Sequence, residues 1–171
     1  MLESRDEFTN VTNLGAEAIG EPGNRTFRLL VDSGSSSASI WLEKEQLFQL
    51  AVAIRRLLAA VPERPDAPGS PPFEREASGL TRLDFKVGKL ALGLDERTGL
   101  LFIDAHEEEE ETASPPRVRV WARRAQLAEL AESAFQVCAA GRPPCPFCTR
   151  PIDPTGHFCP RVNGHHRGSG E

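Results

Sequence analysis

The chain has 171 residues, of which 39% are hydrophobic and 26% charged, and this mix excludes a wholly disordered chain, a collagen-like repeat and a coiled coil. The formal net charge is −5, so the chain is a poor general binder of nucleic acid, because that affinity comes mostly from clustered basic groups. Apolar runs fall far short of the roughly 20 residues of a membrane-spanning helix. The polar N-terminus also lacks the basic start and apolar stretch of a signal peptide, and we therefore expect a cytoplasmic protein that does not enter membranes.

The first part of the chain predicts a hairpin followed by a helix. Residues 1–25 contain few periodic apolar positions, and we predict a leader and a loop that enter regular structure at Thr26. Apolar residues then alternate as in a strand, and residues 39–42 follow a DSGSSS turn as the second strand of the hairpin. From Glu43 the apolar residues recur at helical spacing until Pro62 ends the pattern.

The second part predicts a connector, further strands and a second helix. Residues 62–79 are rich in Pro, Gly, Ser and charge, which predicts a mobile connector. Apolar alternation changes phase at Gly88, where we expect a β-bulge. The remaining elements are predicted in this order: a strand over 83–94, a hairpin loop at 95–99, strands at 100–105 and 117–121 separated by an exposed acidic loop at 107–111, and a helix over 123–140.

The two predicted helices resemble each other when the sequence is shifted by 80 residues. Residues 41–60 and 121–140 share seven identities in twenty positions, with Trp and Gln at matching places. An internal duplication explains this similarity, and so does chance likeness between two Ala- and Leu-rich helices. In either case we expect an α+β fold for residues 1–140, with two pseudo-symmetric antiparallel β-sheet and helix units that form one core.

The C-terminal segment, residues 141–171, has the spacing of a metal site. Cys145 and Cys148 are separated by two residues, and Cys159 follows about ten residues later. Two such thiolates on a tight turn, completed by a second pair of donors, form the tetrahedral shell that Zn²⁺ takes in structural sites. The segment has few large apolar residues, so metal binding, which contributes about 10–16 kcal/mol in zinc-finger peptides, would have to stabilise it. We therefore predict a zinc-ribbon-like knuckle.

The fourth zinc ligand is open between two histidines. The first choice is the set Cys145, Cys148, His157 and Cys159, and the alternative replaces His157 with His165 or its neighbour. Four protein ligands leave no open position for water, which predicts a structural zinc rather than a catalytic one. A redox Cys pair or disulfides are the competing interpretations. The remaining cysteine, Cys138, lies on the apolar stripe of the second helix and is predicted to be buried.

Four motifs resemble the DUF3090 family of bacterial proteins: GEPGNRTF at 20–27, WLEKEQL at 41–47, VGKLALGLD at 87–95 and GRPPCPFCTRPIDPTGHFCPRVNG at 141–164. The resemblance implies no assigned activity. It implies protein partners among kinase-like or phosphomutase-like neighbours, and it supports His157, because the family often has Tyr at the position of His165. This chain departs from the family at Thr149, where glycine is usual in the last turn of the knuckle.

These observations lead to one expected function and two alternatives. We expect a non-enzymatic binding or adaptor protein whose structural Zn²⁺ tail presents a surface to a protein partner, with no catalytic residue. The first alternative is nucleic-acid binding through the basic tail, with Arg161 as the contact. The second is an enzyme or enzyme subunit that acts on a phosphorylated small molecule through Arg25, which lies beside a glycine-rich turn. That GEPGNRTF turn lacks the ending of a phosphate-binding Walker loop, so a purely structural turn is the favoured interpretation.

Overall fold

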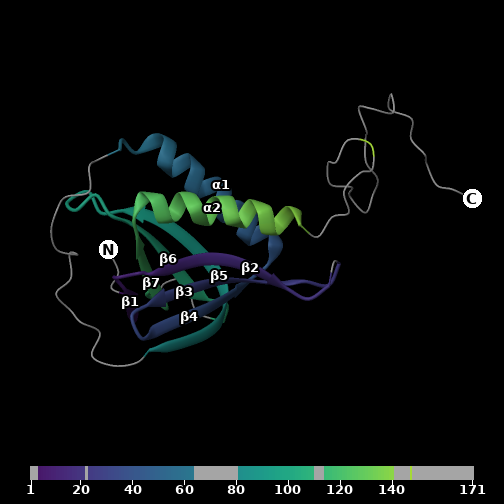
Figure 1. Ribbon diagram of the computed structural model, residues 1–171. Helices are drawn as coiled ribbons and strands as arrows, with labels where there is room; N and C mark the ends of the chain where they lie inside the picture. Colours follow the sequence, from purple (N-terminus) through teal and green to yellow (C-terminus); the bar gives the residue numbers. More distant parts are fainter. Residues whose placement is uncertain (1–3, 22, 64–80, 110–113, 141–146, 148–171) are drawn as a thin grey trace, which may run out of the picture.

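The computed structural model describes residues 4–21, 23–63, 81–109, 114–140 and 147. It shows an α+β fold in which two helices lie over one side of a seven-stranded sheet (Figure 1). The helices are α1 (Lys44–Ala60) and α2 (Arg124–Ala139). The strands are β1 (Asp6–Phe8), β2 (Asn13–Ile19), β3 (Thr26–Ser33), β4 (Ser36–Leu42), β5 (Arg82–Leu94), β6 (Leu101–Glu107) and β7 (Val118–Ala122).

The sheet is mixed, which corrects the prediction of antiparallel units. Its strand order is β1-β7-β6-β5-β4-β3-β2. Four neighbouring pairs are antiparallel, whereas β1 with β7 and β4 with β5 are parallel. The parallel pairs join segments that are remote in sequence, and neither pairing could be recognised from local alternation.

The two edge strands of the sheet are consecutive in the chain. Only four residues, 9–12, join the end of β1 to the start of β2. In a flat sheet of seven strands, six spacings would separate the edges by about 29 Å. The five residue steps from Phe8 to Asn13 reach at most about 18 Å. The sheet must therefore curl so that its edges approach each other.

Each half of the sheet repeats one pattern of pairing. The first part of β5 pairs in parallel with β4, the strand that leads into α1, and the second part pairs with β6. In the other half, β1 pairs in parallel with β7, the strand that leads into α2, and β2 pairs with β3. β1 therefore corresponds to the first part of β5, and β2 corresponds to the second part.

One hydrophobic core joins both halves. The inward side chains of the strands form a single cluster with the buried stripes of the two helices. The buried stripes are Leu47, Leu50, Ala51 and Ile54 on α1 and Leu127, Leu130, Ala131, Ala134 and Cys138 on α2. Both helices start in the same way: the backbone N–H of Glu43 donates to Gln46 Oε1, and that of Arg123 to Gln126 Oε1, each at 2.8 Å.

The structure confirms both predicted helices, the bulge at Gly88 and the burial of Cys138. The prediction of an unstructured leader before Thr26 is wrong, because β1 and β2 lie within it. β1 has only three residues. On one face of β2 the residues are Leu14, Ala16 and Ala18, and two of these three are small. Neither strand therefore carries a strong apolar signal. The predicted connector falls mostly outside the described residues, as does the tail except for Phe147.

Arg124, at the start of α2, closes the C-terminal end of α1. Its guanidinium donates to the carbonyl of Val61 at 2.9 Å and to the carbonyl of Leu58. The last carbonyls of a helix have no partner within the helix, and a cation there also meets the negative end of the helix dipole.

We expect Arg124→Met to lower the free energy of unfolding by about 1–2 kcal/mol, because it leaves these carbonyls without their charged donor. Urea denaturation followed by circular dichroism measures the change. Arg56→Met is the matched control, because Arg56 is exposed on α1, and it should change stability by less than about 0.5 kcal/mol. Equal effects of the two substitutions would contradict the capping role of Arg124.

Candidate functional site

The predicted zinc ligands lie outside the described residues. This holds for the first-choice set, for the alternative ligand and for the predicted nucleic-acid contact, that is, Cys145, Cys148, His157, Cys159, His165 and Arg161. Of the residues predicted to carry function, Arg25 alone is described. Within the described residues, no three His, Cys, Asp or Glu side chains group closely enough to hold a metal ion.

Arg25 lies on the hairpin that joins β2 to β3. The turn is closed by a hydrogen bond from Asn24 N–H to Glu21 O at 2.9 Å. Gly20 has a φ of 108°, and a Cβ there would lie 2.7 Å from the carbonyl oxygen of Asn24, so both the backbone conformation and the space require glycine. The GEPGNRTF motif is therefore a hairpin turn. The Nε atom of Arg25 is buried and has no hydrogen-bond partner among the described residues.

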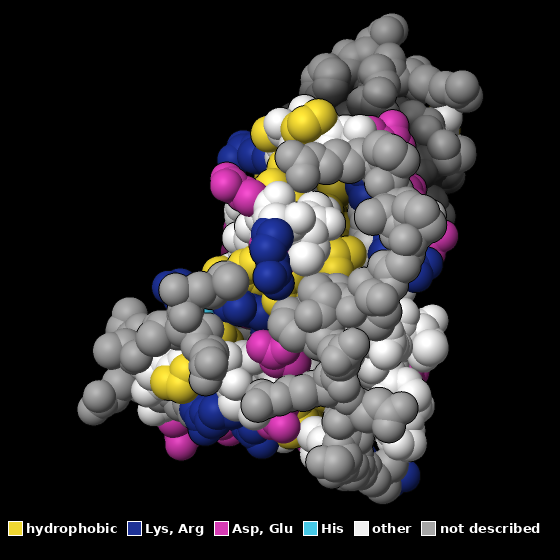
Figure 2. All heavy atoms as spheres, turned by 90° about the vertical axis from the view of Figure 1, so that its left-hand side faces the viewer, with side chains coloured by type: hydrophobic (Ala, Val, Ile, Leu, Met, Phe, Trp, Pro, Cys, Tyr) yellow, Lys and Arg dark blue, Asp and Glu magenta, His cyan; other side chains and the backbone are white. Residues whose placement is uncertain are grey.

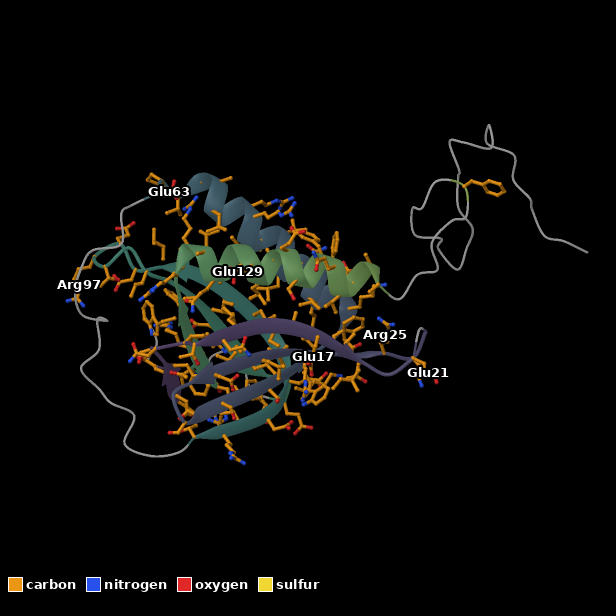
Figure 3. All side chains as sticks on the ribbon, in the orientation of Figure 1. Glu17, Glu21, Arg25, Glu63, Arg97 and Glu129 are labelled. Carbon is orange, nitrogen blue, oxygen red and sulfur yellow. The ribbon has the colours of Figure 1, made fainter. Side chains whose placement is uncertain are left out.

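The hairpin of Arg25 extends toward the place where the C-terminal tail begins. Gln126 Nε2 donates to Val11 O at 2.7 Å, and Ser133 Oγ donates to Ala16 O at 3.3 Å, so α2 runs along β2 in the same direction. The end of α2 consequently lies at the hairpin end of β2, where Figure 3 shows Arg25 and Glu21.

The start of α1 lies close to the end of α2, at the same end of the molecule as Arg25. Cys138 Sγ lies 3.8 Å from the carbonyl oxygen of Lys44, the first residue of α1. Two large apolar side chains near this end are exposed: Ile19 of the hairpin (44%) and Phe48 of α1 (42%). We call this region, formed by Ile19, Arg25, Lys44, Phe48 and Ala140, the tail junction.

An aromatic pair crosses from α1 to α2 and includes Phe48 of the tail junction. The rings of Phe48 and Phe135 meet edge to face with centroids 5.5 Å apart. The guanidinium of Arg55 lies over Phe135 at 4.5 Å and forms an ion pair with Glu132 at 3.0 Å. Both charged side chains of that pair are more than half exposed, so the pair contributes little to stability.

The outer face of the sheet, away from the helices, holds a buried ion pair that sequence reasoning missed. Arg119 of β7 forms two hydrogen bonds with Asp104 of β6, Nε to Oδ1 at 2.6 Å and Nη2 to Oδ2 at 2.7 Å. The guanidinium lies over the rings of Phe102 at 4.2 Å and Trp121 at 5.8 Å. The hydrogen bond to Asp104 raises the pKa of Arg119 against the opposing effect of burial, and the charges of Asp104 and Glu7 raise it further. Each carboxylate oxygen has a partner, which makes the pair a structural element.

A more open arrangement of the same kind lies on the outer face of the other half. Arg28 of β3 pairs with Glu17 of β2 and lies 5.2 Å from the ring centre of Trp41. The indole N–H of Trp41 donates to Asp84 Oδ1 at 2.8 Å. In each half, therefore, the Trp that precedes the helix lies beside an Arg that is paired with a carboxylate.

Two hollows stand out on the surface of the described residues. A pocket of about 80 Å³ lies between the end of α1, the β5–β6 hairpin and the start of α2. Figure 2 faces this end of the molecule, where basic and acidic side chains are interspersed among apolar ones. The pocket is smaller than the roughly 300 Å³ of an ordinary ligand site. A groove of about 450 Å³ lies between α1 and β5, lined by Gln46, Gln49, Leu50, Ala53, Leu90 and Leu92 among others.

None of the described helices is long and apolar enough to cross a membrane. In comparisons with known proteins, the model of a family described as "Protein of unknown function (DUF3090)" matches residues 6–159. The match spans both halves of the sheet and ends at Cys159, the last of the first-choice zinc ligands. No curated protein and no solved structure matches the chain.

Proposed function

The chain belongs to the DUF3090 family of proteins of unknown function, and from this premise we propose that it is a non-enzymatic binding or adaptor protein of the cytoplasm. In this proposal residues 1–140 contain the α+β core, and residues 141–171 hold one structural Zn²⁺ and present a surface to a protein partner. The single observation that carries the proposal is the Cys-x2-Cys and His-x-Cys spacing of residues 145–159.

The donor set fits zinc. Cys145, Cys148 and Cys159 supply three thiolates and His157 an imidazole, a combination that Zn²⁺ takes in closed tetrahedral sites. A reducing compartment keeps these thiols free to bind metal. The ion supplies folding energy to the segment. His165 remains the alternative to His157 as the fourth ligand.

The tail junction supports a role in protein binding. The tail begins where α2 ends, beside the exposed Ile19 and Phe48 and the cation Arg25. Apolar side chains exposed next to a charged group are a feature of protein interfaces. A zinc-stabilised tail attached at this point would present its surface together with these residues.

We also infer that the two halves of the core are copies of one unit. The matching Trp41 and Trp121 precede the helices, and the matching Gln46 and Gln126 accept the same capping hydrogen bond. Each Gln also donates to a backbone carbonyl of the segment beneath its helix: Gln46 to Gly88 O of β5 at 3.3 Å, and Gln126 to Val11 O, in the connection between β1 and β2, at 2.7 Å. Shared roles at matched positions support duplication over chance similarity.

Metal analysis of the purified chain tests the zinc proposal. Wild-type protein should carry one Zn²⁺ per chain, and Cys148→Ser should lose it, because a hydroxyl does not replace a thiolate ligand. His157→Ala should lose the zinc while His165→Ala keeps it; the reverse result identifies His165 as the ligand. Cys138→Ser is the matched control, because this cysteine is buried on α2, and it should keep the metal. Reduced wild-type protein without metal would refute the proposal.

Capture of partners from native cells tests the adaptor role. Wild-type bait should retain a protein partner that Cys148→Ser and Ile19→Asp baits lose, since the two variants alter the tail and the tail junction. The kinase-like and phosphomutase-like proteins are the expected candidates. Retention of nucleic acid that disappears with Arg161→Ala would favour nucleic-acid binding over the adaptor role.

A second candidate function is favoured by the buried Arg25 Nε, which lacks a partner among the described residues. A guanidinium donor without a partner suits a phosphate oxygen, so an enzyme or enzyme subunit that binds a phosphorylated small molecule at the hairpin is the alternative. Thermal stabilisation by millimolar phosphate or a sugar phosphate, lost in Arg25→Ala, would favour it. No stabilisation in the wild type would remove it.

A further inference from the structure

β5 has an open edge along its second half. The strand bends at the bulge between Val87 and Lys89. Before the bulge it pairs with β4, whose last partner on β5 is Lys86, and after the bulge it pairs with β6. Among the described residues, no strand pairs with the other edge of residues 89–94.

The backbone along this edge is set for pairing. Asp95 N–H donates to Leu100 O at 2.8 Å, and the β5–β6 register continues from this pair. Residues of an antiparallel strand alternate between those bonded to the neighbour and those whose N–H and C=O point away. Counting back from Asp95, the backbone groups of Leu90, Leu92 and Leu94 point toward the open edge. Within the described residues, these groups form no hydrogen bond on that side.

The corresponding edge in the other half is covered. There α2 lies along β2, and the hydroxyl of Ser133 donates to Ala16 O. The residue of α1 that matches Ser133 after the shift of 80 is Ala53, which has no hydrogen-bonding side chain. Ala53 lines the groove of about 450 Å³ that separates α1 from Leu90 and Leu92. The groove between α1 and β5 thus corresponds to the contact between α2 and β2, but it is open.

The sequence of the open edge is complementary to itself. Residues 89–95 read Lys-Leu-Ala-Leu-Gly-Leu-Asp, with Leu92 at the centre. If a second copy pairs antiparallel about Leu92, Leu90 lies opposite Leu94 and Lys89 lies opposite Asp95. In this register Leu90, Leu92 and Leu94 of one copy, whose backbone N–H and C=O groups point outward, lie opposite Leu94, Leu92 and Leu90 of the other. This is the arrangement that antiparallel hydrogen bonding requires.

We propose that the chain forms a two-fold symmetric dimer by antiparallel pairing of the two β5 edges, with the second strand seated in the groove beneath α1. Symmetric dimers use the same patch on both subunits, and this edge meets that condition. No ion pair involves Lys89 within the described residues, so it is available to Asp95 of the second copy. The carboxylate of Asp95 also accepts from Arg97 N–H and the Thr98 hydroxyl, both at 3.0 Å, which fixes its position at the end of the strand.

Sedimentation of the full chain between about 1 and 100 µM tests the dimer. Wild-type protein should dimerise reversibly, and Lys89→Glu should raise the dissociation constant roughly tenfold, because each of the two symmetric charge pairs becomes repulsive. Arg82→Glu is the matched control: it makes the same charge change on the same strand before the bulge, and it should leave the dimer intact. The dimer should also survive chelation and Cys148→Ser, which separates it from any association through the tail.

Amide exchange gives an independent measurement. The N–H groups of Leu90, Leu92 and Leu94 should exchange slowly in the concentrated wild type and roughly threefold faster in Lys89→Glu, because the monomer fraction rises with the square root of a dissociation constant that increases about tenfold. The N–H groups of Ala91 and Gly93, which already bond to β6, should not differ. A chain that is monomeric at 100 µM overturns the proposal, as does a dimer that Lys89→Glu and Arg82→Glu affect equally. Protection of this edge only when a peptide from another protein is added would also overturn it.

Discussion

An Asp104→Leu substitution is expected to lower the free energy of unfolding by about 3–5 kcal/mol. The side chains of Arg119 and Asp104 are only 5% and 11% exposed, and two hydrogen bonds join them. Removing the carboxylate leaves a guanidinium without its charge partner between Phe102 and Trp121, where water reaches it poorly. Urea denaturation of the full chain, followed by circular dichroism, measures the loss.

Two further variants separate the value of the pair from the cost of breaking it. Asp104→Leu combined with Arg119→Met should recover most of the stability, since apolar residues of similar volume can replace a buried pair. Glu132→Leu breaks the exposed pair with Arg55 and should cost less than about 1 kcal/mol. If Asp104→Leu costs no more than Glu132→Leu, the burial argument is wrong.

A Gly93→Ala substitution on the same face should destabilise the protein by about 1–3 kcal/mol. Gly93 of β5 lies opposite Phe102 of β6, and the phenyl ring covers it. A Cβ at residue 93 would lie 2.2 Å from Cζ of that ring. The ring cannot move away freely, because the guanidinium of Arg119 lies 4.2 Å from its centre. Thermal and urea unfolding measure the effect.

Gly15→Ala is the matched control for this prediction. Gly15 lies in β2 and, like Gly93, occupies the interior of a strand. A Cβ at residue 15 meets nothing within 4 Å. Alanine there should leave stability unchanged or raise it slightly, because it restricts the unfolded chain. A loss at residue 15 as large as that at residue 93 would show that backbone effects, and not the ring of Phe102, determine the cost.

Much of the fold follows from local pattern. The apolar stripes predicted both helices to within a few residues, and the change of phase at Gly88 predicted the bulge. β1 and β2 were missed because alanine carries little hydrophobic signal and a strand of three residues has almost no period. The parallel pairs could not be predicted at all, because their partners are specified by the packing of the whole sheet.

Some of the candidate sites could likewise be predicted from the sequence, and others could not. The zinc ligands could be named from spacing alone, and they remain a prediction because they lie outside the described residues. The Asp104–Arg119 pair had a signal that was not used: each is a single charged residue within an otherwise apolar strand segment, at 101–105 and 118–122. The groove had no sequence signal, since it depends on how far α1 stands from β5.

The curl of the sheet also bears on the order in which the protein folds. The hairpin of β3 and β4 and the helix after it are neighbours in sequence and can assemble early. β1 cannot join the sheet until residue 118 reaches residue 6. Bringing together ends roughly 110 residues apart costs about 4 kcal/mol of chain entropy. The N-terminal strand of a nascent chain therefore cannot dock until residues 118–120 have left the ribosome, after most of the core has been synthesised.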